Sequence, residues 1–393
     1  MQRRHSSEEV LERPIMKERT PPKIRMRRKK GSVDLVFLLI ILVLLAFGVV
    51  MVFSASYASS YAKHGDSLYT IRKHLIYVVA GIAIMIFLAK FPPYFSYERL
   101  ALFIYIVALG LMAIVVISNG FKAGRWLKIG GMSIQPSEVM KFAMIVVCSA
   151  LVSKNHDQMH KMKYGVVPFA LALIPVIALM MIQHHLSGTI IICGIVLVMM
   201  FVGGTRLYWF IILVVLGGAG LAGIVLWKGV EYMQDRVRIW LDPFSDLLGR
   251  SWQTVQSMVA IGSGGVMGLG LGNSRQKYLY LPEPQNDFIF AIVCEELGMI
   301  GAILIILLFI FLIYRGFAIA NKAPNKFAAM MVIGITVQIA IQAMLNIAVV
   351  TNSIPNTGIS LPFFSYGGTA LTMQLAEVGI ILNISRYSLE EKT

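Results

Sequence analysis

The stretch YLPEPQNDFIFAIVCEELG, residues 280–298, decides how the sequence is interpreted. Two carboxylates, Glu283 and Asp287, stand before a long apolar run, and two more, Glu295 and Glu296, lie inside it. An ionised side chain costs several kcal/mol in hydrocarbon, so acidic residues within such runs mark functional or paired positions. The stretch therefore predicts a membrane helix with a functional site at its start.

Apolar runs of this kind recur along the whole chain. Hydrophobic residues make up 57% of the 393 residues and charged residues only 14%, which excludes an ordinary water-soluble domain. Each run is close to the roughly 20 residues that cross a bilayer as a helix. We predict an all-α polytopic membrane protein with about ten transmembrane helices in one domain, residues 33–387. The predicted spans are 33–53, 75–91, 100–119, 138–153, 166–183, 188–204, 207–227, 288–314, 327–351 and 366–385.

The net charge of +15 is explained by membrane topology. If the N-terminus is inside, 22 of the 35 lysines and arginines fall in the N-terminal tail, the inner loops and the C-terminus, as the positive-inside rule expects. The segment KIRMRRKKG before the first span is interpreted as a topology signal that contacts anionic lipids, and no nucleic-acid partner is expected. Residues 1–32 are predicted to be a disordered basic cytoplasmic tail and residues 388–393 a cytoplasmic C-terminal tail.

Asp287 has two interpretations at this point. Pro282 and Pro284 flank Glu283, keep the segment extended and end any helix before it, so the eighth span is predicted to start near Asn286 or Asp287. As an N-cap, Asp287 would contribute about 1 kcal/mol. As a carboxylate at the boundary between water and membrane, it would have a pKa raised by partial desolvation and could act as a base.

A second group of candidate residues lies in GRWLKIGGMSIQPSEVMKF, residues 124–142. RWLKI and MSIQ are joined by two glycines and predict a small hairpin. Pro136 suits the first position of the following helix, and Glu138 suits the third, where it favours the helix dipole. Lys141 lies three residues further on the same face, about one turn inside the membrane. We therefore predict a Glu138–Lys141 ion pair that faces the interior of the bundle.

The third group lies in TNSIPNTGISLPFFSYGGTALTMQ, residues 351–374, between the last two spans. Its prolines and glycines forbid a regular helix, and it is too apolar for a free loop. Irregular backbone at membrane depth is tolerated when it is buried in protein or lines a cavity. Ser365 in this segment is included among the candidate cavity residues, and all three groups are predicted on the same outer face.

The large outer loop, residues 228–287 between spans seven and eight, contains further patterns. Residues 231–244 carry apolar residues at three- and four-residue spacing, which predicts a helix lying in the membrane interface. The glycine-rich residues 262–272 lack the preceding strand of a nucleotide-binding loop and are interpreted as a flexible outer loop. His184 and His185 are adjacent, do not share a helical face, and predict no metal site.

Four segments together resemble the SEDS family of RodA, FtsW and SpoVE proteins, with FtsW and SpoVE closer than RodA. They are GRWLKIGGMSIQPSE, QHHLSGT, AIGSGGVMGLGLGNSRQKYLYLPEPQNDFIFAIVCEELG and NSIPNTGISLPFFSYGGTALTMQ. The resemblance covers about residues 33–387. It implies a peptidoglycan glycosyltransferase in a bacterial cytoplasmic membrane, which polymerises lipid II at the outer face for division or spore cortex synthesis. It also implies a class B penicillin-binding protein, a transpeptidase, as partner.

The resemblance implies roles for individual residues as well. The essential aspartate of the family falls on Asp287, residues of the QPSE segment fall on Glu138 and Lys141, and the loop tryptophan falls on Trp126. One segment departs from the family pattern. Many relatives read QPDLGT or similar where this chain has QHHLSGT, so any role of that aspartate is not carried over.

These residues suggest a mechanism. A sugar hydroxyl must attack an anomeric carbon whose leaving group is a lipid diphosphate. We expect Asp287 to act as a base, which typically contributes about 10²–10⁴ in rate, or as a metal ligand. The diphosphate needs positive charge, which Lys141, Arg236, Arg238 or a divalent cation (Mg²⁺ or Mn²⁺) would supply. The remaining candidate cavity residues are Glu138, Trp126, Glu283 and Ser365.

Two other classes of function compete with this hypothesis. A lipid II flippase or another transporter should place its polar site near the bilayer midplane on broken helices, often with internal repeats, and no repeat is evident in the sequence. A non-catalytic scaffold for a penicillin-binding protein would not need Asp287 or the Glu138–Lys141 pair. Both alternatives are distinguished from the enzyme by adding labelled lipid II to the purified protein.

Overall fold

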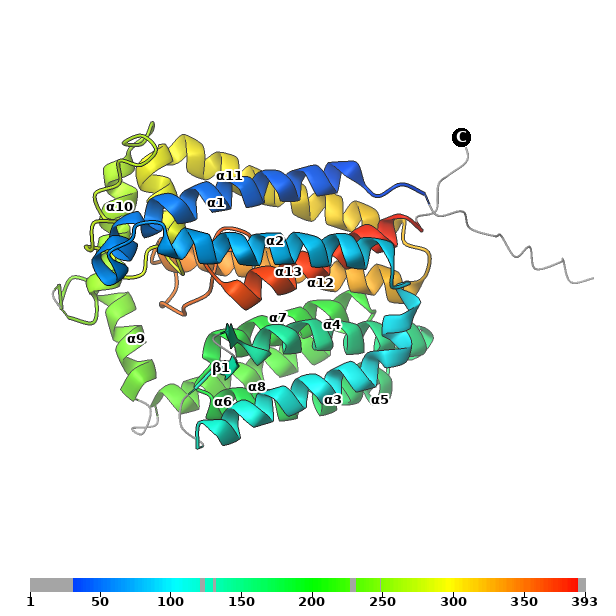
Figure 1. Ribbon diagram of the computed structural model, residues 1–393. Helices are drawn as coiled ribbons and strands as arrows, with labels where there is room; N and C mark the ends of the chain where they lie inside the picture. Colours follow the sequence, from blue (N-terminus) through cyan, green and yellow to red (C-terminus); the bar gives the residue numbers. More distant parts are fainter. Residues whose placement is uncertain (1–30, 121–123, 130–131, 227–230, 248, 388–393) are drawn as a thin grey trace, which may run out of the picture.

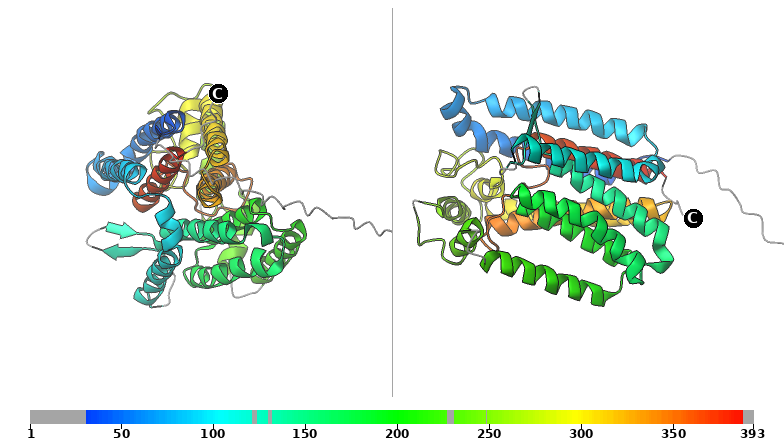
Figure 2. Two further views of the ribbon diagram at one scale, coloured as in Figure 1. Left: turned by 90° about the vertical axis from the view of Figure 1, so that its right-hand side faces the viewer. Right: turned by 90° about the horizontal axis from the view of Figure 1, so that it is seen from below.

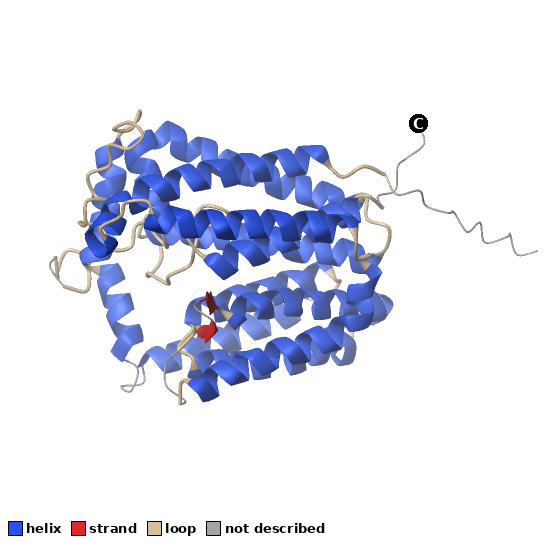
Figure 3. Cartoon of the chain, in the orientation of Figure 1, coloured by secondary structure: helices blue, strands red, loops and turns tan. Residues whose placement is uncertain are grey.

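The computed structural model describes residues 31–120, 124–129, 132–226, 231–247 and 249–387. The predicted tail therefore lies outside the described residues except for its last two positions, and so does the predicted C-terminal tail, residues 388–393. Figure 3 shows that nearly all of the described chain is helical, with one short hairpin.

Each predicted span corresponds to one helix in the described part of the chain. The ten helices are α1 (Leu35–His64), α2 (Tyr69–Lys90), α3 (Phe95–Ser118), α4 (Pro136–Asn155), α6 (Val167–Ile182), α7 (Leu186–Val202), α8 (Leu207–Leu226), α11 (Ile289–Asn321), α12 (Lys326–Val350) and α13 (Gly368–Ser385). The other helices are the short η1 (His156–Gln158) and α5 (Met162–Gly165), and α9 (Glu231–Leu241) and α10 (Trp252–Gly264) in the large loop.

The helices are apolar enough to belong in a membrane. Seven helical stretches of the described chain meet the length and hydropathy of a membrane span on their own, and α7 is apolar but has only 17 residues. The polytopic helical architecture is therefore confirmed, while ten crossings stays a prediction. The first span was predicted too short, because α1 continues for 11 residues beyond residue 53 and ends only at the left-handed Gly65.

The helices that correspond to the predicted spans lie side by side along one common direction, whereas α9 and α10 run across one end of the bundle (Figures 1 and 2). α13 packs along α2, α3 packs against α4, and α12 packs against both α11 and α4. α4 and α12 are the most enclosed of the candidate spans, and their fully buried residues include Met144 and Ile335. Because polar residues on these two helices cannot reach lipid or water directly, they must find partners inside the bundle.

Both ends of the described chain lie at the same end of the bundle. The Gly31 N–H donates to the Arg386 carbonyl at 2.8 Å, and the Asp34 N–H donates to the Ser385 hydroxyl oxygen at 3.1 Å. An even number of crossings requires this arrangement. Which side of the membrane this end faces stays a prediction from the distribution of lysine and arginine.

α11 is broken at Gly298, which has φ 66° and ψ −168° inside an otherwise continuous helix. The break leaves carbonyls without helical partners, and the outer loop supplies the donors. The Leu269 N–H donates to the Glu295 carbonyl at 2.9 Å, and the Gly270 N–H donates to the Glu296 carbonyl at 3.0 Å. The large loop is thereby joined to the helix by backbone hydrogen bonds.

The interpretation of residues 262–272 as a flexible loop is therefore wrong. A Cβ atom at Gly298 would collide with the backbone nitrogen of Gly268, and one at Gly264 would collide with the Cys294 carbonyl. The glycines allow this close approach of two backbones. Sequence reasoning missed the contact because the two partners belong to different elements.

Candidate active site

The predicted hairpin is present beside the start of α4. β1 (Leu127–Ile129) pairs antiparallel with β2 (Met132–Ile134), and the two residues that join them lie outside the described chain. α4 begins at Pro136, as predicted. The hairpin and the first turn of α4 lie in the half of the bundle that also holds α9 and α10 (Figure 1).

The predicted ion pair is confirmed. Lys141 Nζ lies 2.7 Å from Glu138 Oε2, and the two residues are only 2% and 8% exposed. Burial of both charges costs desolvation energy, but the loss of one partner would leave the other charge buried and uncompensated. The pair is therefore fixed inside the bundle.

Asp287 lies just before α11 and is half-buried. The N-cap of α11 is Phe288, with no capping bond from a side chain, so the capping interpretation of Asp287 is wrong. The carboxylate of Asp287 accepts no hydrogen bond from the described residues. Burial raises the pKa of Asp287, and the positive charges of Arg125 and Arg236 oppose this rise. The result is an unbonded carboxylate in an electropositive setting.

The backbone around Asp287 is held by the α12 residue Asn346. The Asn346 side-chain amide donates to the Asp287 carbonyl at 2.7 Å and to the Ile359 carbonyl at 2.6 Å. A Cβ atom at Gly358, which has φ 68°, would lie 3.2 Å from Asp287 Oδ2. The irregular segment after α12 therefore lies directly against the carboxylate, as the convergence of the first and third groups predicted.

Arg125 was missed as a site residue, although it precedes Trp126 in a segment that the sequence analysis singled out. Its guanidinium donates to the His184 carbonyl at 2.5 Å, and its charge acts on Asp287. His185 is buried, and its pKa is lowered to about 3 by burial and by the nearby charges of Arg125 and Lys141. His185 is therefore neutral at physiological pH.

The candidate cations of the large loop differ in position. Arg236 on α9 is half-buried and its charge acts on Asp287, whereas Arg238 is exposed and has no such effect on Asp287. Both lie on the predicted interfacial helix, which α9 confirms as a helix. Trp240 attaches α9 to the third group, because its indole N–H donates to the Asn352 carbonyl at 3.1 Å. Arg236 thus stays a candidate, and Arg238 lacks structural support.

The remaining candidates are Glu283, Ser365 and Trp126. No hydrogen bond or ion pair joins any of them to Asp287 in the described chain. Glu283 forms an ion pair with Lys63 at the end of α1. Ser365 is buried and its hydroxyl accepts from the Leu361 N–H at 2.8 Å, so it holds a turn of the third group. Trp126 is 45% exposed, which suits a surface that meets substrate or lipid.

Glu295 anchors the large loop, which answers part of the question raised by the acidic residues inside the apolar run. It is fully buried and accepts from the Ser274 hydroxyl at 2.5 Å and from the Arg275 N–H at 2.9 Å. Hydrogen bonds to an ionised acceptor are among the stronger ones in proteins. Glu295 therefore fixes the segment that leads towards Asp287.

Glu296 anchors the same segment to α1. Its carboxylate lies 3.1 Å from Lys277 Nζ and accepts from the Ser54 hydroxyl at 2.6 Å. Lys277 also donates to Ser54 at 3.1 Å, so the three residues form one buried network. Glu295 and Glu296 thus have structural roles. The carboxylate of Asp287, which precedes the apolar run, makes no hydrogen bond with the described residues.

Buried amides connect α12 with α13. Gln338 donates to Glu377 at 2.7 Å, and Gln374 donates to Gln342 at 3.2 Å. Glu377 interacts electrostatically with the Glu138–Lys141 pair. The signal in the sequence was the spacing of Gln338, Gln342 and Asn346, which places three amides on one face of an apolar helix.

No group of three or more His, Cys, Asp or Glu residues in the described chain is arranged to hold a metal ion. Mg²⁺ is commonly bound by one or two carboxylates together with substrate phosphates. A divalent cation therefore fits this site only if Asp287 and the substrate share it, and the predicted cation stays a prediction.

Comparisons with known proteins show the family of this chain. A family described as cell cycle proteins of the FtsW, RodA and SpoVE type matches residues 34–390. Stage V sporulation protein E of Bacillus subtilis (strain 168) is 41% identical over 369 residues, which cover 92% of this chain and 100% of that protein. The probable peptidoglycan glycosyltransferase FtsW of Geobacter metallireducens is 36% identical and covers 90% of this chain and 94% of its own.

Solved structures show the same fold. A chain of the structure described as "Structural coordination of polymerization and crosslinking by a peptidoglycan synthase complex" matches with a TM-score of 0.73 and 27% identity, covering 90% of this chain and 98% of that chain. The rod shape determining protein RodA of Thermus thermophilus matches with a TM-score of 0.66 and 22% identity, over 92% of this chain and 99% of its own.

Proposed function

Because the chain belongs to the FtsW, RodA and SpoVE family and is a peptidoglycan glycosyltransferase of the bacterial membrane, we propose that Asp287 is the general base with which it polymerises lipid II. The observation that carries this proposal is the free, half-buried carboxylate of Asp287 under the influence of two arginines. Glu283, Glu295 and Glu296, the other acidic residues of the same stretch, are all engaged in ion pairs or hydrogen bonds.

The reaction balances with the residues present. The hydroxyl oxygen of one sugar forms a bond to the anomeric carbon of another, and its proton passes to the Asp287 carboxylate. The bond between that carbon and the diphosphate oxygen breaks, and the electron pair leaves with the lipid diphosphate. Arg125 and Arg236 stand where they would attract the anionic diphosphate and stabilise the charge that develops on it.

The neighbouring elements keep the base in place. Asn346 holds the Asp287 backbone against the segment at Ile359. The buried Glu138–Lys141 pair lies within α4, the helix that follows the hairpin and Arg125 in the chain. A base must be held within hydrogen-bond reach of the hydroxyl that it deprotonates, so this rigidity supports catalysis. A divalent cation, if bound, would supply further charge to the diphosphate.

The proposed partner is a class B penicillin-binding protein. Support comes from the similarity to a chain of a peptidoglycan synthase complex that coordinates polymerization and crosslinking. The proposed orientation places both termini in the cytoplasm and Asp287 at the outer face, since the lysines and arginines concentrate at the opposite end. The products would then form where a transpeptidase can crosslink them.

The test is polymerisation of labelled lipid II by the purified chain, with and without the partner. Wild-type protein is expected to give glycan polymer. Asp287→Asn keeps size and shape but cannot accept the proton, so polymer yield should fall by about 10²–10⁴ at unchanged folding and lipid II binding. Glu283→Gln is the matched control and should be milder. Yield like that of wild type from Asp287→Asn would refute the assignment.

A further inference from the structure

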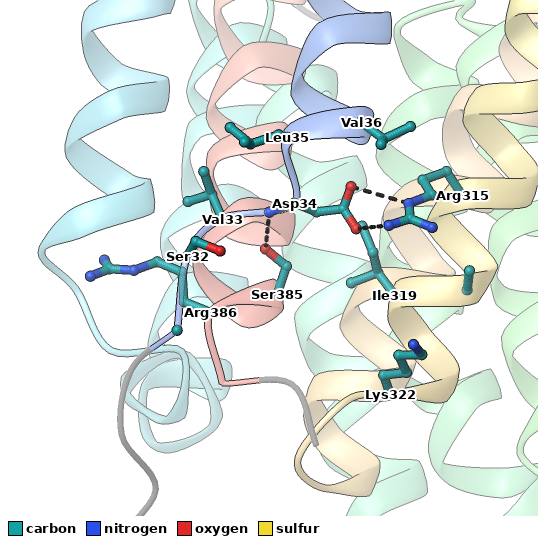
Figure 4. Close-up of a pocket in the computed structure, with 12 residues that line it drawn as sticks. Ser32, Val33, Asp34, Leu35, Val36, Arg315, Ile319, Lys322, Ser385 and Arg386 are labelled. Carbon is teal, nitrogen blue, oxygen red and sulfur yellow. Dashed lines mark hydrogen bonds and ion pairs between the residues drawn. The ribbon is translucent and has the colours of Figure 1, made fainter. Parts of the chain in front are cut away.

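A cavity of about 380 Å³ lies at the end of the bundle where the two ends of the described chain meet (Figure 4). It opens between the start of α1, the last turns of α11 and the end of α13, and its lining includes Asp34, Arg315, Lys322 and Ser385. Nothing in the proposed glycosyl transfer uses this cavity, because α11 places Arg315 and Asp287 near opposite ends of the same helix.

Arg315 is held rigidly in the wall of the cavity. Its Nε donates to Asp34 Oδ1 at 3.1 Å, and its Nη2 lies 2.7 Å from Asp34 Oδ2. Asp34 also accepts from the Phe37 N–H at 2.9 Å as the N-cap of α1. A guanidinium has five N–H donors, so donors remain on Arg315 after the bonds to Asp34 are made. They are preorganised for another oxygen-rich group.

The cavity has an excess of positive charge. Lys322 follows α11, seven residues and about two helical turns beyond Arg315, and no partner for its ammonium is found among the described residues. Arg386 also lines the cavity, but its guanidinium points away from Arg315 and Lys322 and donates to the Ala89 carbonyl at 2.9 Å (Figure 4). Among the described residues of the lining, Asp34 is the one acidic residue, so the cavity favours an anion.

The surface next to the cavity is apolar. Leu35, which lines the cavity, is 68% exposed, and Leu39, one turn further along α1, is 64% exposed. Exposed Tyr314 and Phe311 lie on the facing helix α11. A soluble anion makes no favourable contact with apolar side chains of this kind. The acyl chain of a lipid whose head lies at the cations can contact them.

We propose that this cavity binds the phosphate head of an anionic phospholipid, with Arg315 and Lys322 on the phosphate and the acyl chain along Leu35 and Leu39. Basic pockets between membrane helices are known to bind such heads. The bound lipid would join α1, α11 and α13, the elements that bring the two ends of the chain together. The proposal does not depend on the role of Asp287.

The test is binding of phosphatidylglycerol and phosphatidylcholine to the full-length chain in detergent, followed by native mass spectrometry. We expect phosphatidylglycerol to bind at least about fivefold more tightly. Lys322→Gln removes a cation without breaking the Asp34–Arg315 pair, and should weaken phosphatidylglycerol binding about fivefold, as expected from about 1 kcal/mol per cation. Lys326→Gln removes a cation at the start of α12, outside the cavity, and should leave binding unchanged at an equal melting temperature.

Four outcomes would overturn the proposal. Equal binding of the two lipids, or equal losses in Lys322→Gln and Lys326→Gln, would mean that only diffuse surface charge acts. Displacement of phosphatidylglycerol by millimolar inorganic phosphate would identify a site for a soluble anion. A large gain in lipid binding on truncation after Tyr387 would mean that the acidic C-terminal residues occupy the cavity instead. None of these results bears on the polymerisation assay.

Discussion

Asp287 shows how position gives a common side chain an uncommon role. It stands one residue before the N-cap of α11, so its carboxylate does not serve the helix that follows. Burial raises its pKa, while Arg125 and Arg236 keep the ionised form accessible. A carboxylate whose pKa is raised in this way is a stronger base than an exposed one.

The pH dependence of polymerisation should reflect the pKa of Asp287, which burial raises and the two arginines lower. The base acts only when ionised, so activity should be lost as pH falls through the raised pKa of Asp287. Arg125→Gln removes one of the charges that oppose the rise, and its acidic limb should therefore move to higher pH. Arg238→Gln, on the exposed side of α9, is the matched control. The measurement is kcat/KM against pH, and identical acidic limbs for Arg125→Gln and wild type would contradict the assigned electrostatics.

Gly358 allows a second test at the level of single residues. Gly358 and Gly65 both have φ 68°, but a Cβ atom at Gly65 meets open space, whereas one at Gly358 meets the Asp287 carboxylate. Alanine at either position should cost about 1 kcal/mol of stability through backbone strain. Only Gly358→Ala should also lose polymerase activity. Equal activities of the two variants at matched folding would show that the third group does not shape the site.

At the scale of elements, the features that could be predicted from the sequence are those that depend on residues close together in the chain. The ten apolar runs, the hairpin before Pro136 and the Glu138–Lys141 pair all follow from residues close together in the chain, and all appear in the structure. The break at Gly298 and the role of Arg125 did not follow. Their partners, the Gly268 segment and Asp287, are brought near by packing of distant elements, which periodicity does not report.

The buried pair on α4 gives a prediction for an element. Lys141→Met should leave Glu138 buried without a partner and cost about 3–5 kcal/mol, and Glu138→Gln should cost a similar amount. The double variant should lose less than the sum, because neither charge remains. Thermal unfolding of the four proteins in detergent measures the coupling. Strict additivity would mean that the two side chains do not interact.

In the whole molecule, the candidate active site lies far from the two ends of the described chain. The start of α11, the third group and the large loop lie at one end, and the two ends of the described chain meet at the other (Figure 1). The buried amide side chains of α12 lie between these two ends. Gln338 donates to Glu377, and Asn346 donates to the Asp287 carbonyl and so joins the segment before α11 to the interior. A glycosyltransferase built in this way presents its base at one membrane surface only, so its orientation decides whether it can work.

Orientation is therefore the prediction on which the mechanism depends. We expect an impermeant maleimide added from outside to label Leu271→Cys, an exposed position in the large loop, and to spare Lys326→Cys, an exposed position at the start of α12. Cys148 and Cys294 are buried in their helices, and a parent with all three native cysteines replaced by serine removes the remaining background. Permeabilised cells should label both positions, which controls for access. Labelling of both from outside would contradict the proposed crossing between them. Labelling of Lys326→Cys alone would place Asp287 at the cytoplasmic surface, where growing glycan strands would be released away from the wall.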